Sequence, residues 1–179
     1  MPSSNVLLDA DALDRALTRL SYQVLERNAA DPRRIVLIGL PTRGYTLAQR
    51  LASRLAPIAG FEPPVGKMDI TFHRDDLELN IPVPQVSHIP FDITRRVVVL
   101  VDDVLFTGRS VRAALAALSD LGRPAAIQLL ALIDRGHRQV PIRADFFARK
   151  ITTELEDTVQ VKLTEVDPVP ADVVEVVSP

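Results

Sequence analysis

The stretch Arg96-Val-Val-Val-Leu-Val-Asp-Asp-Val-Leu-Phe-Thr-Gly-Arg-Ser110 decides the fold of this chain. Its first part, residues 97–101, is an unbroken apolar and mostly β-branched run, which predicts a parallel strand buried on both faces. Asp102 and Asp103 follow where we expect that strand to end. The apolar spacing of residues 111–118 predicts a helix directly afterwards.

This strand, turn and helix predict a ligand site. In an open α/β sheet the ligand crevice lies outside the carboxyl ends of the strands, and a helix N-terminus there offers N–H groups to an anion. Carboxylates beside such an anion site suit a sugar phosphate, because they can bind ribose hydroxyls and a hydrated Mg²⁺. The alternative is that the two neighbouring aspartates are solvated surface residues before an ordinary helix, with no ligand site. We disfavour it because Asp102 and Asp103 repel each other when no cation is present.

The segment Val98-Val-Leu-Val-Asp-Asp-Val-Leu-Phe-Thr-Gly-Arg-Ser110 resembles the phosphoribosyl-pyrophosphate (PRPP) signature of type I phosphoribosyltransferases. The resemblance implies that Asp102 and Asp103 hold the ribose and lie near a Mg²⁺ carried by PRPP and water. It also implies that a run of seven residues holds the 5′-phosphate: Val104, Leu105, Phe106, Thr107, Gly108, Arg109 and Ser110.

Strands and helices alternate along the rest of the chain. We expect helices at residues 11–28, with Asp11 as N-cap, and 46–55, broken at Pro57; strands at 35–40, 66–71, 127–133, 159–163 and 173–178; and a short strand or bend at 146–151. Right-handed crossovers then favour a doubly wound α/β sheet. The expected architecture is the type I phosphoribosyltransferase fold: a single domain over residues 1–179, with a mainly parallel central sheet flanked by helices and a small hood formed by the chain ends.

Composition limits the possible functions. The chain has 179 residues, 47% of them hydrophobic, a net charge of −2 and no cysteine. Disulfides, thiolate catalysis and cysteine-bound metals are therefore excluded. No apolar run reaches the roughly 18 residues of a membrane span, and the first residues do not resemble a secretion signal. We expect a cytoplasmic protein that does not associate with membranes.

A second loop, Thr42-Arg43-Gly44, lies between the strand at 35–40 and the next helix. Its glycine allows close backbone approach, and its arginine is permanently charged and suited to phosphate. Alone, such a turn is an ordinary loop. Beside the aspartate pair it fits a pyrophosphate loop, so we assign Thr42, Arg43 and Gly44 to substrate binding, and Arg43 with Asp102 and Asp103 to catalysis.

Four further segments resemble the PyrR family of bacterial pyrimidine-operon attenuation regulators. The principal one is Leu132-Ile-Asp-Arg-Gly-His-Arg-Gln-Val-Pro-Ile-Arg-Ala-Asp-Phe-Phe147, and the others lie at residues 15–19 with 26–28 in the first helix, 68–77 and 121–124. The resemblance implies binding of pyrimidine-operon leader mRNA when UMP or UTP is plentiful. It also implies conversion of uracil and PRPP to UMP and pyrophosphate with Mg²⁺, by a homodimer or a tetramer built from dimers.

The resemblance assigns further residues. Arg135, Phe146 and Phe147 would complete the substrate site, with the two phenylalanines beside the base. Independently of the resemblance, the long segment 74–92 lacks a periodic pattern, which predicts a lid that would contribute Arg74 and Asp75. The RNA-binding residues would come from the first helix and the basic segment 135–150: Arg15, Thr18, Arg19, Tyr22, Arg138, Arg143, Arg149 and Lys150.

The chain departs from the PyrR pattern at Tyr22, His73, Phe106 and residues 148–154. The last difference predicts an altered backbone near the base site, whereas the phosphate and ribose motifs are intact. Two classes of function stay open: an RNA-binding regulator with transferase activity, and a uracil phosphoribosyltransferase of pyrimidine salvage without RNA function. Under the second, the basic residues would be an ordinary solvated face.

Overall fold

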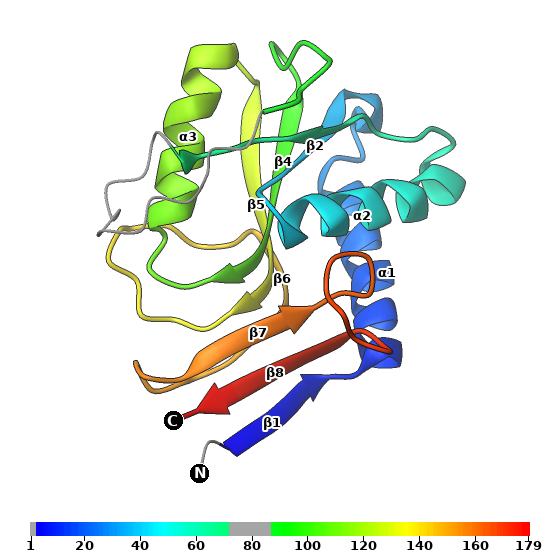
Figure 1. The fold of residues 1–179 in the computed structure, drawn as a ribbon. Helices are drawn as coiled ribbons and strands as arrows, with labels where there is room; N and C mark the ends of the chain where they lie inside the picture. Colours follow the sequence, from blue (N-terminus) through cyan, green and yellow to red (C-terminus); the bar gives the residue numbers. More distant parts are fainter. Residues whose placement is uncertain (1–2, 72–86) are drawn as a thin grey trace.

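The computed structural model describes residues 3–71 and 87–179. A parallel five-stranded sheet with the order β3-β2-β4-β5-β6 forms its centre (Figure 1). The strands are β2 (Ile35–Gly39), β3 (Val65–Lys67), β4 (Val97–Leu105), β5 (Ala126–Asp134) and β6 (Phe146–Lys150). The helices are α1 (Ala10–Arg27), α2 (Arg43–Ala59) and α3 (Arg109–Leu121), with a 3₁₀ turn at Pro32–Arg34. The expected α/β class and parallel central sheet are confirmed.

Alternation along the central strands divides the core into two layers. Val99 and Val101 of β4 pack with the buried residues of α1 and α2, whereas Val98 and Leu100 pack with those of α3. Successive strand residues face opposite sides of a sheet, so β4 must be apolar on both faces. This is why the run at residues 97–101 could be identified as a central strand.

The two ends of the chain meet in a smaller antiparallel sheet. It consists of β1 (Ser3–Leu8), β8 (Val173–Ser178) and β7 (Thr158–Lys162), with β8 in the middle. Figure 1 shows this sheet below the parallel one, next to the carboxyl ends of β4 and β5. We refer to it as the hood. Its position brings β7 towards the edge of the parallel sheet where ligands bind in open α/β folds.

Two helix boundaries differ from the sequence prediction. The N-cap of α1 is Asp9, whose carboxylate accepts a hydrogen bond from the Ala12 N–H at 2.8 Å; Asp11 lies in the first turn instead. The helix α2 is longer than expected at both ends and continues through Pro57 to Ala59. A proline inside a helix removes one hydrogen bond. Here the missing bond would have reached the carbonyl of Ser53, a residue exposed to water.

The predicted lid lies mostly outside the described residues, and so do His73, Arg74 and Asp75. Its last part is described and packs against the body of the protein. The backbone of His88 exchanges two hydrogen bonds of 2.8 Å with Lys67, and Ile89 and Phe91 pack against the core beside α3. Within the described ranges, no helix is long and apolar enough to cross a membrane.

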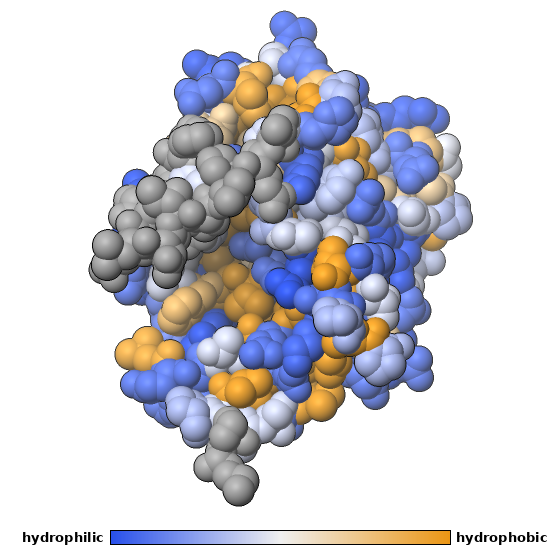
Figure 2. Space-filling model, in the orientation of Figure 1, coloured by the Kyte–Doolittle hydropathy of each residue, from blue (hydrophilic) through white to orange (hydrophobic). Residues whose placement is uncertain are grey.

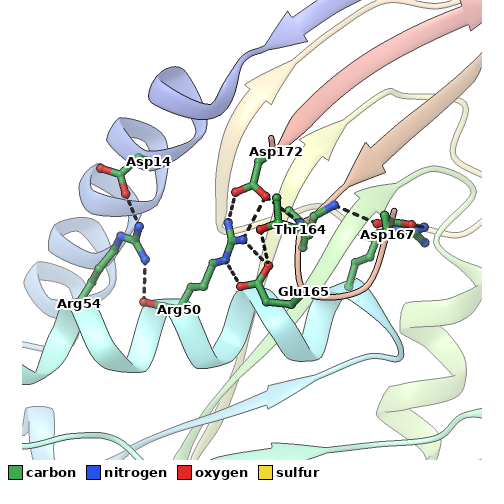
Figure 3. Close-up of polar contacts among 9 residues, drawn as sticks. Asp14, Arg50, Arg54, Thr164, Glu165, Asp167 and Asp172 are labelled. Atoms are coloured by element: carbon green, nitrogen blue, oxygen red, sulfur yellow. Dashed lines mark hydrogen bonds and ion pairs between the residues drawn. The ribbon is translucent and has the colours of Figure 1, made fainter. Parts of the chain in front are cut away.

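Arg50 anchors the hood to α2 (Figure 3). Its guanidinium donates to Glu165 at 2.5 and 2.8 Å and to Asp172 at 2.5 and 3.2 Å, and all three side chains lie between α2 and the loop from β7 to β8. Hydrogen bonds from Arg50 hold the pKa values of the Glu165 and Asp172 carboxyls below their usual range. The network therefore stabilises the hood most when both acids are ionised.

Replacing Arg50 with methionine should lower the free energy of unfolding by about 2 kcal/mol at pH 7. Because the folded-state pKa values of Glu165 and Asp172 are depressed, this stabilisation is present above their unfolded values near pH 4 and is lost as pH falls through the folded ones. Urea unfolding from pH 7 to pH 3 should show the difference between wild type and variant shrinking. A difference that stays constant over this range would contradict the assignment.

Arg54→Met is the matched control for that experiment. Arg54 also lies on α2 and pairs with a carboxylate, but its partner Asp14 has a 65% exposed side chain, whereas that of Asp172 is 15% exposed. Exposed ion pairs contribute about 0–1 kcal/mol, so this variant should be less destabilised than Arg50→Met.

Candidate functional site

The turn between β4 and α3 encloses a cavity of about 300 Å³. Its walls come almost entirely from this turn: Asp102, residues 104–111 and Gln139. The turn requires Gly108, which has a φ of +87° and precedes the first residue of α3; a Cβ there would lie 2.7 Å from Val140 Cγ2. The structure thus brings the predicted phosphate-binding residues together at a helix N-terminus, where N–H groups and the helix dipole favour an anion.

The two neighbouring aspartates lie within β4 rather than after it, which corrects the predicted strand end. Because side chains alternate along a strand, they face different sides of the sheet. Asp102 is 9% exposed and lines the phosphate cavity; Asp103 lines a second cavity on the side of α2 and the hood. Each carboxylate accepts a hydrogen bond of 2.9 Å from the next backbone N–H. The pair thus separates two cavities instead of pointing into one.

The predicted pyrophosphate loop lies directly beside this pair. A Cβ on Gly44 would meet the Val101 carbonyl oxygen at 2.4 Å and Asp102 Cα at 3.2 Å. Only glycine therefore lets the start of α2 approach β4 this closely. Thr42 is the residue before α2, and the peptide bond between Pro41 and Thr42 is cis. Arg43 lies in the first turn of the helix, not in a preceding loop as predicted.

Arg43 forms a bidentate ion pair with Asp167, which lies in the loop between β7 and β8 of the hood. Its Nε donates to Asp167 Oδ2 at 3.1 Å and its terminal nitrogen donates to Oδ1 at 2.6 Å. These bonds hold the pKa of the Asp167 carboxyl below its usual value. Since the Arg43 side chain is still 36% exposed, it can exchange this partner for an incoming anion.

The second cavity, of about 430 Å³, lies between Arg43, Asp103 and the hood. The hood contributes residues 159–162 of β7 and residues 167–169. Because β7 is an edge strand of the hood, backbone N–H and C=O groups on one side of it have no neighbouring strand. Figure 2 shows the surface hollowed between the body of the protein and the hood. These hood residues are not among the site residues predicted from the sequence.

Phe106 is held in place by two neighbours behind the phosphate loop. The Arg135 guanidinium lies 4.1 Å from the centre of the Phe106 ring, and the His137 ring contacts the same ring edge-on at 5.8 Å. Arg135 also donates to Thr153 Oγ1 at 3.1 Å and to the Glu154 carbonyl at 2.8 Å. It is 6% exposed, and burial lowers the pKa of its guanidinium. Arg135 therefore supports the loop from behind and does not line the phosphate cavity.

The prediction for Phe146 and Phe147 is not supported by their positions. Phe146 is 5% exposed and packs in the core beside α1. Both rings line a third cavity, of about 620 Å³, between α1 and β6, and neither lines the cavities of Asp102 and Asp103. The reason is register: Phe146 pairs with Leu130 in the middle of β5, whereas the ligand-binding edge lies at the carboxyl end.

The predicted RNA-binding residues divide into two groups. Most of them are exposed on α1 or on β6 and its approach: Arg15, Thr18, Arg19, Tyr22, Arg143, Arg149 and Lys150. Arg19 connects these elements by donating to the Ala148 carbonyl at 2.7 Å. Arg138 is different, because its guanidinium is bonded to oxygens of the phosphate loop and its surroundings. Arg138 is therefore less available to RNA than the seven exposed residues.

The residues at the aspartate pair fit Mg²⁺ carried in by a ligand. Among the residues that the structure describes, no group of three or more acidic, histidine or cysteine side chains could hold a metal. Mg²⁺ usually keeps several waters and binds one or two carboxylates together with substrate phosphates. The carboxylates of Asp102 and Asp103, beside a helix N-terminus and Arg43, supply this kind of donor set.

Comparison with known proteins places the chain in a family. Residues 3–168 match the model of the phosphoribosyl transferase domain. Two relatives called "Bifunctional protein PyrR" are similar over nearly their whole length. The one from Chloroflexus aurantiacus is 52% identical over 93% of this chain and 92% of its own, and the one from Bacillus mycoides is 51% identical over 93% and 94%.

Solved structures show the same fold at low sequence identity. The hypoxanthine phosphoribosyltransferase of Trypanosoma cruzi, solved with its product IMP, has a TM-score of 0.72 and 15% identity, covering 94% of this chain and 91% of its own. That of Staphylococcus aureus has a TM-score of 0.65 and 17% identity, covering 84% and 79%. These similarities concern the fold alone, whereas the two relatives that are about half identical in sequence identify the family. Together with the PRPP motif at β4, they show that this chain belongs to the phosphoribosyltransferase family and, within it, to the PyrR proteins.

Proposed function

We propose that this protein binds the leader mRNA of a pyrimidine biosynthetic operon in response to uridine nucleotides, and so attenuates expression of the operon. We also propose that it converts uracil and PRPP to UMP and pyrophosphate. The observation that carries the enzymatic half is the phosphate cavity at the N-terminus of α3, with Asp102 on its wall and Arg43 nearby. Membership of the PyrR family supports both halves.

In the proposed mechanism the 5′-phosphate of PRPP binds at residues 104–110 and the pyrophosphate at Thr42, Arg43 and Gly44. Asp102 and Asp103 lie between the two and would hold the ribose hydroxyls. Mg²⁺ bound with PRPP would neutralise charge on the departing pyrophosphate. Arg43 would stabilise the same charge from the start of α2, since a fixed cation at a leaving group acts most strongly in the transition state.

The second cavity is our candidate for the uracil subsite. It is open towards Asp103 and Arg43, and its far wall is the edge strand β7. Uracil carries two carbonyl and two N–H groups, which the unpaired backbone groups of an edge strand can match. This assignment replaces Phe146 and Phe147, and the ion pair between Asp167 and Arg43 forms part of the wall of this cavity.

The RNA half is supported by the surface where α1 meets β6. Arg15 and Arg19 are exposed on α1, and two aromatic rings are exposed nearby, Tyr22 at 55% and Phe147 at 40%. Cationic side chains neutralise RNA phosphates and exposed rings stack on unpaired bases. We therefore assign Phe147 to this surface instead of the uracil site. A regulator of nascent mRNA acts where transcription occurs, so we place it in the cytoplasm, and we expect it to form a homodimer.

A paired assay on the wild-type protein tests the two halves. UMP formation from uracil, PRPP and Mg²⁺ measures the transferase. A gel-shift titration of a pyrimidine-operon leader RNA, with and without UMP, measures the regulator. UMP formation supports the transferase, and tighter RNA binding in the presence of UMP supports the regulator. Transferase activity without specific RNA binding would instead indicate a uracil phosphoribosyltransferase of pyrimidine salvage. Absence of both activities would contradict the proposal as a whole.

Replacing Arg15 with alanine should weaken binding of the leader RNA and reduce its dependence on salt. Loss of one phosphate contact lowers the slope of log affinity against log salt by about one unit. Arg15 is preferable to Arg19, which also bonds the Ala148 carbonyl. The test is a gel-shift series between low and physiological salt, with UMP formation as the internal control. An unchanged affinity and slope would exclude this face of α1 from the RNA surface.

A further inference from the structure

The Arg138 guanidinium donates hydrogen bonds to five oxygens. Its Nε donates to the Ile142 carbonyl at 2.9 Å, and one terminal nitrogen donates to the Asp134 carboxylate at 2.5 Å. The other terminal nitrogen reaches three carbonyls, those of Phe106 at 2.6 Å, Gly136 at 3.0 Å and Leu105 at 3.3 Å. A guanidinium has five N–H donors in a rigid plane, and the bonds to these five oxygens involve all three of its nitrogens.

Two of these carbonyls belong to the phosphate loop itself. Leu105 and Phe106 are the residues at which β4 turns towards α3. The carbonyl of the next residue, Thr107, accepts a hydrogen bond of 3.0 Å from the Gln139 N–H. Three successive carbonyl groups of the loop are thus held by the segment that follows β5.

The geometry of the peptide bond fixes the direction of the loop N–H groups once the direction of its carbonyl groups is known. In a trans peptide the carbonyl oxygen and the following N–H point in opposite directions, and the peptide bonds of the loop are trans because the cis bond in the described chain is elsewhere. If the carbonyls of residues 105, 106 and 107 point towards Arg138 and Gln139, the N–H groups of residues 106, 107 and 108 point away from them. Successive N–H groups on one side of a turn form an anion-binding nest.

From this we infer that Arg138 is a positioning residue for the phosphate loop: by holding the Leu105 and Phe106 carbonyls, it directs the N–H groups of Phe106 and Thr107 towards the 5′-phosphate of PRPP and UMP. The inference rests on the proposed function and assigns Arg138 a task within it. Arg138 does not touch the substrate in this assignment. It acts through the peptide groups of the loop.

An arginine suits this task better than a lysine. The acceptors of Arg138 are four backbone carbonyls and the Asp134 carboxylate. A planar guanidinium with five N–H donors can reach acceptors in several directions, whereas a lysine ammonium offers only three donors. The Asp134 side chain is 8% exposed. Its carboxylate also accepts a hydrogen bond of 3.1 Å from the Gly136 N–H, which ties the charged pair to the turn behind the loop.

The variants Arg138→Ala and Arg138→Lys test this inference. Because the 5′-phosphate is bound in both the ground state and the transition state, loosening the loop should raise KM for PRPP by about ten-fold or more while kcat changes little. The dissociation constant of UMP, measured by calorimetry, should rise in parallel. Low millimolar guanidinium chloride should restore UMP binding in the alanine variant, whereas sodium chloride at equal ionic strength should not.

Arg123→Ala is the matched control. Arg123 also donates to backbone carbonyls, those of Ser119 at 2.7 Å and Gly122 at 3.2 Å, but it lies beyond the opposite end of α3. Its KM and UMP affinity should equal those of the wild type. Thermal unfolding of all variants separates a loosened loop from a loss of fold. If the alanine variant does not fold, the lysine variant tests the inference, because it keeps a positive charge beside the buried Asp134 carboxylate but loses the planar guanidinium.

A folded Arg138 variant with wild-type KM and wild-type UMP affinity would overturn the inference. So would a change confined to kcat. The wild-type protein offers an independent measurement: UMP should shift the amide resonances of Phe106, Thr107 and Gly108, and unshifted resonances would also overturn it. If the wild type neither binds UMP nor forms it, the proposed function itself fails, which this series distinguishes from a failure of the positioning role alone.

Discussion

Replacing Asp102 or Asp103 with asparagine should lower the rate of UMP formation by about 10²–10³-fold, without loss of the fold. The reason is the position of the pair in β4, between the phosphate cavity and the cavity beneath the hood. Asparagine keeps the size of the side chain and an acceptor oxygen, so the hydrogen bonds to the next N–H groups can persist. What it removes is the negative charge opposite a developing cationic ribose and its Mg²⁺.

Steady-state rates with saturating Mg²⁺ measure this effect, and thermal unfolding confirms that the variants are folded. Asp120→Asn is the control, because Asp120 is an exposed carboxylate near the end of α3. Since Asp102 and Asp103 face different cavities, we expect Asp102→Asn to weaken UMP binding more, and Asp103→Asn to affect turnover more. Near wild-type turnover in both variants would contradict the assignment of this site.

The middle of the central sheet could be predicted because β2, β4 and β5 are largely buried on both faces. Burial on both sides requires continuous apolar runs, and these identified β2, β4 and β5. The strand β4 nevertheless continues through Asp102 and Asp103 to Leu105, because its ladder with β5 continues as far as Asp134. Charged residues can end an apolar run without ending the strand, since backbone pairing does not depend on side-chain polarity.

The hood was harder to predict in full. The strand β1 was missed because Ser3–Leu8 is mostly exposed and lacks alternation, and it is paired only with β8 at the far end of the chain. Such pairing is a long-range property that local sequence does not contain. The same limit applies to the hood residues at the second cavity. Their role depends on the hood lying over the carboxyl ends of the parallel strands.

Residue type alone was also insufficient in the basic segment after β5. Arg138 and Arg143 lie in the same short stretch and look alike in sequence. In the structure, Arg143 is exposed, whereas Arg138 turns inward to the carbonyls of Leu105 and Phe106. Gly136 and His137, directly before Arg138, adopt left-handed backbone conformations with φ values of +78° and +58°. The apolar pattern of the sequence does not predict such a local conformation, and so it does not predict which arginine faces the loop.

Replacing Arg43 with alanine should lower kcat/KM for PRPP by about 10²-fold and weaken inhibition by pyrophosphate. Arg43 is the cation that the first turn of α2 presents in the cavity of Asp103, and its loss leaves the departing pyrophosphate without the positive partner that the protein itself supplies. Initial rates in both directions measure the effect. Arg54→Ala, further along the same helix, is the control for a general effect on α2. Unchanged pyrophosphate inhibition in Arg43→Ala would exclude Arg43 from the leaving-group site.

Asp167→Asn should have the opposite effect on pyrophosphate. In the free protein Arg43 is paired with Asp167, so an incoming pyrophosphate must compete with this carboxylate. Asparagine removes the charge but can still accept the hydrogen bond from the Leu163 N–H. Partly exposed ion pairs contribute about 1 kcal/mol, so pyrophosphate should inhibit this variant about five-fold more strongly. Weaker inhibition would instead mean that Asp167 holds Arg43 in the orientation that pyrophosphate requires.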